Sequence, residues 1–507
     1  MIKKCLHTLI ALLVLSPALA SQTRVESTGG LSLVLQDSSA EVNPYNFGNP
    51  AGLALLPAVS RFDISAPWFQ LYPASSSFQS MQADGFLSRL TSGFDNTSLL
   101  SSSTNAFQYE GLILFPTPKW AFQAGGDLLH ATNQPDTTAG IMDQSLDSTR
   151  ALGRTAYDFG PFAFGAQFQW AQYNFNYQPV SGAAATLISG NTTETLLIPE
   201  AGLLASFPMD SSKSPAILRL GGSFTMILPS STDNQNFDGV VIGAPVTVEK
   251  NITVSSYQSF GPEAYLDVPD SLQAVILDHL ENTSLSQEQT SSSAATAISQ
   301  PAFHLETENG NVFLGLFKWH FPLLISSKGI LNMDQGAYLL INSKQVDYFD
   351  PAGTTAFATN NSDIQGAIGT GLDKDKDFGV GLQATLETQS GSSDPAGGTS
   401  LPVNFFGYQV SLGGEKWFSK VFAFRTGIVF ESDRNQGAQA VQRPFYFVPS
   451  GTQITCTTLT VGAGYADSGL QTDLRLWYGQ PSIYDSPNPN DFATTMGAQL
   501  SLSILFR

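Results

Sequence analysis

The side chains that most often do catalytic chemistry are few and scattered in this chain. None of the histidines lies in a His-Glu-x-x-His pattern, and the sequence has neither a Gly-x-Ser-x-Gly elbow nor a phosphate-binding loop. Beyond residue 20 the histidines are His130, His279, His304 and His320. We expect His279 on a loop helix and His320 near a strand end, each as a solvated or interface residue. A hydrolase site built from distant strands stays open, but no residues point to one, so we expect no enzyme and no cofactor.

Alternating acidic residues suggest metal chemistry at one place. Asp373, Asp375 and Asp377 alternate with lysines, which resembles the start of an EF-hand calcium loop. However, Gly379 comes one position late, and Ala384 stands where that loop needs a glutamate. We therefore expect a charged hairpin turn and no metal. The mature chain would keep only Cys456, so neither an internal disulfide nor a cysteine zinc site can form.

Four charged residues lie inside apolar alternating stretches near the end of the chain: Glu415, Arg425, Asp473 and Arg475. Glu415 and Arg425 flank a short turn at Ser419-Lys420, so they can meet directly or diagonally across two strands. We expect these charges to face a lumen, because an arginine facing lipid near the bilayer midplane costs about 2–4 kcal/mol. Two interpretations stay open: a structural salt-bridge network, or direct contact with a substrate.

The elements that must position these residues are β-strands. The chain ends ATTMGAQLSLSILFR, in which Leu500, Leu502, Ile504 and Phe506 alternate with small polar residues. Because side chains alternate across a strand, one face is apolar. About 14 to 17 stretches of this kind can be counted. A soluble antiparallel sheet gives the same pattern, and that alternative stays open.

The tryptophans follow the same strands. Each of the six lies in or at the end of an alternating stretch, as an aromatic girdle at a membrane interface requires. They are Trp68, Trp120, Trp170, Trp319, Trp417 and Trp477.

The first twenty residues predict export. Lys3 and Lys4 precede a short apolar run from Leu9 to Leu15, and Ala18-Leu19-Ala20 has the small-x-small pattern of a cleavage site. We expect a Sec-type signal peptide over residues 1–20, cleaved before Ser21. After residue 20 there is no apolar run of about 18 residues, so a membrane-embedded chain would have to form a closed barrel.

Charge and composition limit the partners. The formal net charge is −19, and removal of Lys3 and Lys4 with the signal peptide makes it −21. Such a chain does not attract nucleic acid through its phosphates. Charged residues make up only 13% of the sequence, against about 25% in soluble domains. A membrane barrel would explain this low fraction of charged residues, because its lipid-facing strand positions must be uncharged.

Residues 21–58 differ from the strands that follow. Asn-Pro occurs at Asn43-Pro44 and again at Asn49-Pro50, and Pro50 suits the first position of a helical turn. The stretch Phe47-Gly48-Asn49-Pro50-Ala51-Gly52-Leu53 resembles the Asn-Pro-Ala segment in the N-terminal hatch of the long-chain fatty acid transporter family of outer-membrane proteins (FadL-like). A proline-rich leader into the first strand is the alternative.

Two further stretches resemble the same or related proteins. The late hairpin of that family has a Gly-x-Glu strand followed by a strand with Arg-x-Gly, and Glu415, Arg425 and Gly427 occupy those places here. The terminal strand is similar to the signal by which bacterial outer-membrane barrels are recognised for assembly, although Arg507 follows the aromatic Phe506.

A long interruption of the strand rhythm over residues 266–302 predicts a short helix. Pro269-Asp270-Ser271 can start it, and Leu272, Val275, Ile276 and Leu280 have helical spacing. We place this helix in a long outer loop. It either forms one wall of a surface groove for hydrophobic molecules or packs on its own loop.

The resemblance implies a complete arrangement. The fold class is all-β: a transmembrane antiparallel β-barrel of about 14 strands (14–16) over residues 59–507, with the hatch of residues 21–58 inside its lumen. It implies uptake of long-chain fatty acids or hydrocarbons across the outer membrane of a Gram-negative bacterium. The expected partners are outer-membrane lipid, a hydrophobic ligand and the barrel assembly machinery. A general porin and a structural or partner-binding barrel are the alternatives.

Overall fold

The computed structural model describes Thr28, Leu31, residues 49–55 and most of the chain from Ser60 to Phe506. Within that span it omits residues 72–102, 118, 135–142, 179–188, 211–214, 229–231, 242–243, 270, 294–301, 327–328, 350–354, 375–376, 396–400, 438–440, 443–446, 449–450, 468–469 and 484–494. The predicted signal peptide and Asn43, Pro44 and Phe47 of the predicted hatch lie outside the described residues.

The described chain consists of β-strands and one 3-10 turn, η2 (Pro50–Leu55). The strands are β1 (Ser60–Leu71), β2 (Ser103–Pro116), β3 (Trp120–Gln134), β4 (Asp143–Asp158), β5 (Phe162–Gln178), β6 (Ser189–Pro208), β7 (Ile217–Ile227), β8 (Thr232–Val241), β9 (Ala244–Val268), β10 (Leu272–Ser293), β11 (Ala302–Ser326), β12 (Gly329–Phe349), β13 (Thr355–Lys374), β14 (Phe378–Pro395), β15 (Leu401–Trp417), β16 (Phe422–Asn435), β17 (Val441–Gln442), β18 (Phe447–Val448), β19 (Gln453–Ala466), β20 (Leu470–Ile483) and β21 (Thr495–Phe506). No helix that the structure describes is long and apolar enough to cross a membrane.

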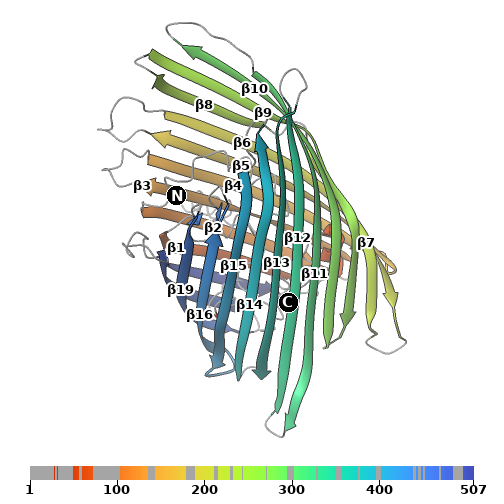
Figure 1. Cartoon of the computed structure of the whole chain (residues 1–507). Coiled ribbons are helices and arrows are strands. Elements are labelled where there is room, and N and C mark those ends of the chain that lie inside the picture. Colours follow the sequence, from red (N-terminus) through yellow and green to blue (C-terminus); the bar gives the residue numbers. More distant parts are fainter. Residues whose placement is uncertain are drawn as a thin grey trace, which may run out of the picture.

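All strands except the small β17–β18 hairpin belong to one antiparallel sheet, seen as a single curved wall in Figure 1. Each strand pairs mainly with its neighbours in the chain. β1 pairs with β2 on one side and with the last strand, β21, on the other. The backbone pairing therefore runs in a ring and returns to its first strand.

The number of strands exceeds the 14–16 predicted from the family resemblance. Among the residues that the structure describes, the sheet has 19 strands. β7 and β8 pair in turn with different parts of the same two strands, β6 and β9, so they are two halves of one interrupted strand. The ring therefore has about eighteen positions, an even number, as a barrel with both ends on one side requires.

The two faces of the ring differ sharply in chemistry. We call the face that contacts η2 the inner face and the opposite one the outer face. On β16, Phe422, Phe424, Ile428 and Phe430 are exposed on the outer face, while Ala423, Arg425, Gly427 and Val429 between them are buried. The outer face of other strands is likewise apolar, with Phe164 and Phe168 on β5 and Leu382 and Leu386 on β14. Buried carboxylates, arginines and amides occupy the inner face.

The connections at the two ends of the sheet differ in length. At the end where β1 begins and β21 ends, short connections join the strands, such as residues 117–119, 159–161 and 375–377. At the opposite end the connections include residues 72–102, 135–142, 179–188 and 484–494. This asymmetry is typical of outer-membrane barrels, whose periplasmic turns are short and whose outer loops are long.

The predicted loop helix is wrong: Leu272, Val275, Ile276 and Leu280 lie in β10, which pairs with β9 and β11 over nearly its whole length. Val275 is buried on the inner face (1% exposed), whereas Ile276 is 53% exposed on the outer face. A strand that is apolar on both faces for a few residues produces the same spacing as a helical stripe. No helical groove wall exists at these residues.

The tryptophans divide between the two faces, contrary to a uniform girdle. Trp120 and Trp319 are exposed on the outer face, and Trp120 packs edge-on against Tyr157 at a ring-centroid distance of 4.8 Å. Trp417 and Trp477 are buried on the inner face, where Trp417 Nε1 donates to Glu415 and the Arg475 guanidinium lies over the Trp477 ring. An aromatic position in a strand does not by itself reveal which face it occupies.

Pairing of β1 with β21 can be tested by disulfide formation. Ser65 and Ser501 are register partners, so a Ser65→Cys/Ser501→Cys variant in a Cys456→Ala background should cross-link under mild oxidation. Directly opposed Cβ atoms are about 4.5–5.5 Å apart, within reach of a disulfide. Electrophoretic mobility without reductant reports the bond. Ser65→Cys/Ser503→Cys, two residues out of register, should cross-link poorly; equal cross-linking of both pairs would contradict this register.

Candidate functional site

The N-terminal segment contacts the inner face through Asn49, which is fully buried. Its Nδ2 donates to the carbonyl oxygens of Gly222 (3.1 Å) and Leu203 (3.5 Å), which face each other on β7 and β6. Its Oδ1 accepts the backbone N–H of Ala51 (2.9 Å). An asparagine before a proline is a favoured start for a helical turn, because its side chain satisfies a free N–H group. Asn49 thus starts η2 and binds the wall with the same amide.

Two inner-face glycines make room for this contact. A Cβ atom on Gly202 would overlap the Asn49 carboxamide, and one on Gly165 would overlap the backbone of Pro50 and Ala51. The turn therefore lies directly on the backbone of β5 and β6. Glycine at a strand interior often marks such a close backbone approach.

Apolar packing adds to these polar contacts. Ala51 is buried in a cluster with Leu204, Tyr265, Val275 and Leu277 from β6, β9 and β10. Leu53 is fully buried against Ala121 and Ala156, on β3 and β4. The turn is thus in contact with consecutive strands over a wide part of the inner wall.

A second contact lies on a different part of the ring. Leu31 is fully buried against Ala367 of β13, with Leu316 and Tyr338 beside it. A Cβ atom on Gly413 of β15 would overlap the Thr28 carbonyl. Thr28 and Leu31 on the one hand, and residues 49–53 on the other, therefore touch strands far apart around the sheet.

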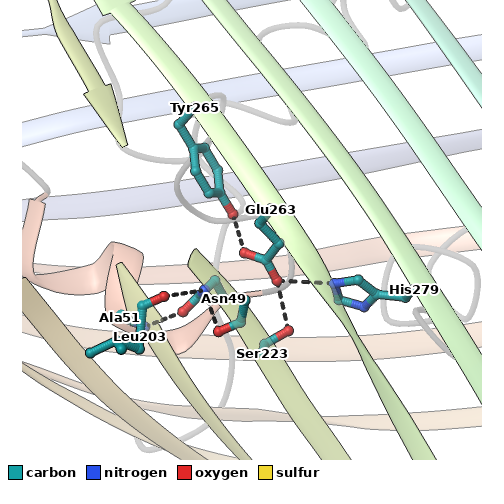
Figure 2. A network of polar contacts seen from close by, with 8 residues as sticks. Asn49, Ala51, Leu203, Ser223, Glu263, Tyr265 and His279 are labelled. Carbon is teal, nitrogen blue, oxygen red and sulfur yellow. Dashed lines mark hydrogen bonds and ion pairs between the residues drawn. The ribbon is translucent and has the colours of Figure 1, made fainter. Parts of the chain in front are cut away.

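A buried carboxylate lies next to the Asn49 contact. Glu263 Oε1 accepts from Ser223 Oγ (2.7 Å) and is 3.0 Å from His279 Nε2, and Glu263 Oε2 accepts from Tyr265 OH (2.8 Å). Figure 2 shows this Glu263 cluster (Ser223, Glu263, Tyr265 and His279) beside Asn49 and Ala51. The serine hydroxyl donates to the glutamate and not to the histidine, so the cluster does not form a serine nucleophile activated by histidine.

Arg425 is the largest fully buried side chain on the inner face, at 2% exposure. It is the direct register partner of Glu415, and its Nε donates to Glu415 Oε2 at 3.1 Å. Its Nη1 forms an ion pair with Asp473. One arginine therefore joins β15, β16 and β20. Arg475 lies two residues along β20 and stacks on Trp477.

The remaining sequence candidates have ordinary partners. Asp377, in the β13–β14 turn, forms ion pairs with Lys374 and Lys416. The hydrogen bond from Lys374, and secondly that from Lys416, lowers the pKa of Asp377 to about 2. His320 Nδ1 is 2.5 Å from Asp334 on the inner face. In the parts of the chain that the structure describes, no group of histidine, cysteine and acidic side chains could hold a metal ion.

Sequence reasoning reached some of this site and missed the rest. Asn49, Pro50, Ala51, Gly52 and Leu53 lie on the inner face together, as do Glu415, Arg425 and Asp473. The Glu263 cluster was missed. Gly165, Gly202 and Gly222 interrupt apolar strands, which indicates a close backbone approach. Nothing in the sequence says which segment approaches them.

Comparison with known proteins gives no family assignment. No family model and no curated protein matches the chain. Among solved structures, a FadL homologue of Pseudomonas aeruginosa is 10% identical with a TM-score of 0.38, over 97% of this chain and 99% of that one. The Pseudomonas putida toluene transporter TodX is 10% identical with a TM-score of 0.35, over 97% and 99%. The unliganded ferric citrate transporter FecA is 8% identical with a TM-score of 0.39, over 89% and 79%. Likeness this distant carries no argument about function.

The glycine contact predicts a position-specific effect of one added methyl group. Gly165→Ala should lower the free energy of unfolding by about 1–3 kcal/mol, as overpacking does, because Pro50 and Ala51 must move. Gly153→Ala on the neighbouring strand is the matched control, since a Cβ atom there meets nothing within 4 Å. Urea unfolding of the detergent-folded protein measures both. Equal effects of the two variants would show that η2 does not lie on Gly165.

The Arg425 ion pairs predict a large loss of stability on charge removal. Arg425→Met should cost about 3–5 kcal/mol, because Glu415 and Asp473 remain buried without a counter-charge. Arg425→Met/Glu415→Gln/Asp473→Asn should recover much of the loss. Lys416→Met, which removes an exposed ion pair, should change urea unfolding little. A loss for Arg425→Met as small as that for Lys416→Met would contradict the buried network.

Proposed function

We propose that this protein is an outer-membrane transport barrel that takes up hydrophobic small molecules past a hatch formed by residues 21–58. The observation that carries the proposal is the N-terminal segment bound at two places on the inner face of a ring of strands. A general porin needs no chain segment across its lumen. The other features of the molecule fit this function as follows.

The outer face favours a lipid environment. Large apolar side chains are exposed on strand after strand, such as Ile368, Leu382, Leu412 and Leu459, without a core to cover them. Soluble proteins rarely expose apolar patches of this extent. With the buried charges on the inner face, the sheet has the inverted polarity of a transmembrane barrel. The short connections would face the periplasm and the long ones the cell surface.

The inner wall favours a hydrophobic cargo. Leu152, Leu196, Ile198 and Ile227 occupy buried inner-face positions on β4, β6 and β7. The lumen of an aqueous porin is polar. A wall that alternates apolar patches with isolated buried polar groups suits long-chain fatty acids or hydrocarbons, the substrate class implied by the Asn-Pro-Ala resemblance.

The interrupted strand offers a place where the wall can change. β7 ends at Ile227 and β8 begins at Thr232, and Leu228 N donates to Leu197 O just beyond the end of β7. An irregularity in strand pairing bends the sheet locally. Movement of the hatch near Asn49, or of this interruption, would open a way for the cargo.

The test of the function is mass spectrometry of small molecules extracted from the purified, detergent-solubilised protein. We expect a stoichiometric fatty acid, hydrocarbon or similar apolar molecule. A chain lacking residues 22–58 is the control and should lose part of this load. A full-length protein that carries no small molecule and conducts ions steadily in planar bilayers would support a porin instead. A protein that carries no small molecule but co-purifies with a partner protein would support a structural barrel.

A further inference from the structure

The Glu263 cluster joins a buried carboxyl group to Tyr265, a member of the apolar cluster that contains Ala51. Glu263 is almost completely buried; its two oxygens accept from Ser223 and Tyr265, and Oε1 lies 3.0 Å from His279 Nε2. A buried carboxylate without such donors is costly, so the donors are held in place. One of them, Tyr265, is itself buried, with 1% of its surface exposed.

The same tyrosine belongs to the apolar cluster that buries Ala51 of the hatch. Its ring belongs to the buried cluster that contains Ala51, while its hydroxyl is bound to Glu263 (Figure 2). On the neighbouring strand, Gly222 accepts from Asn49 and is followed directly by Ser223, another donor to Glu263. The turn at residues 49–51 is therefore bounded by two strands whose side chains meet at one carboxylate.

We propose that Glu263 and Tyr265 are positioning residues that hold the hatch closed. The inference rests on the proposed function, in which the hatch moves. The hydrogen bond to Glu263 holds the Tyr265 ring in the apolar cluster that buries Ala51. Ser223 and His279 fix Glu263 in turn. Loss of the Tyr265–Glu263 hydrogen bond frees the ring and loosens this cluster, so residues 49–55 leave the wall more often.

The chain supplies a matched control on the same two strands. Tyr257 is also buried on β9, and its hydroxyl donates to Glu281 of β10 at 3.3 Å. It thus repeats the tyrosine–glutamate pair eight residues away. Tyr257 is absent from the cluster that contains Ala51. Tyr257→Phe therefore removes a comparable hydroxyl at a residue outside the cluster that contains Ala51.

The experiment is hydrogen–deuterium exchange of the full-length protein in detergent, read on the peptide that covers residues 49–55. Tyr265→Phe should speed exchange of that peptide about fivefold, the factor for one net hydrogen bond. Peptides from β14 to β16 should not change. Tyr257→Phe should leave the hatch peptide at the wild-type rate. Glu263→Gln/Tyr265→Phe should match Tyr265→Phe alone, because the two residues act through one bond.

The outcomes separate clearly. Unchanged exchange of residues 49–55 in Tyr265→Phe, or an equal rise in Tyr257→Phe, would overturn the proposal. If Tyr265→Phe alone does not fold, the double variant, which has no buried charge short of a donor, gives the same reading. Exchange reports hatch release whether or not a ligand is carried. An empty barrel with a fast-exchanging Tyr265→Phe hatch would therefore refute the transport function and leave the positioning role intact.

Discussion

The pairing of the first strand with the last is the constraint on which the rest of the molecule depends. While β1 and β21 are joined, the sheet has an inside, and alternate residues of every strand are directed into it. Backbone groups in lipid have no water to bond, so a sheet can stand in a membrane only if its edges meet. Inner-face burial of Arg425, Glu263 and Asn49 follows from the same closure, since an open sheet would expose them to solvent.

Within that ring, polar residues on the inner face are tied to one another rather than left to water. Arg425 joins three strands through two carboxylates, and Glu263 joins β7, β9 and β10 through its three neighbours. Such buried groups are expensive to separate, so they fix the register of the wall. Asn49 contacts the wall in a different way: glycines on the strands lack side chains, so Asn49 reaches backbone carbonyls directly. Because this contact joins the Asn49 side-chain amide to backbone carbonyls, it can break without leaving a charged group unpaired.

The alternation of side chains predicted most of the strands, because a period of two is local and survives in each strand separately. It failed at β10, where Leu272, Val275, Ile276 and Leu280 are apolar on both faces and gave a helical spacing. The strand number was set too low by the family resemblance, whereas counting residues alone gave up to about 17 stretches. The pairing of Glu415 with Arg425 could be predicted from the sequence, because a short turn makes them neighbours. The contacts of Glu263 could not be predicted, because its partners lie on strands whose register depends on the whole ring.

The central claim is that the outer face meets lipid while the inner face encloses the hatch. Spin labels placed one at a time at residues 423–430 of β16, in a Cys456→Ala background and in phospholipid vesicles, test it most directly. Oxygen, which concentrates in lipid, should relax labels at Phe424, Ile428 and Phe430 strongly and those at Ala423 and Val429 weakly, with a period of two residues. If a water-soluble nickel chelate instead reaches Phe424, Ile428 and Phe430 better than oxygen does, the apolar face is not in a bilayer and the account is contradicted.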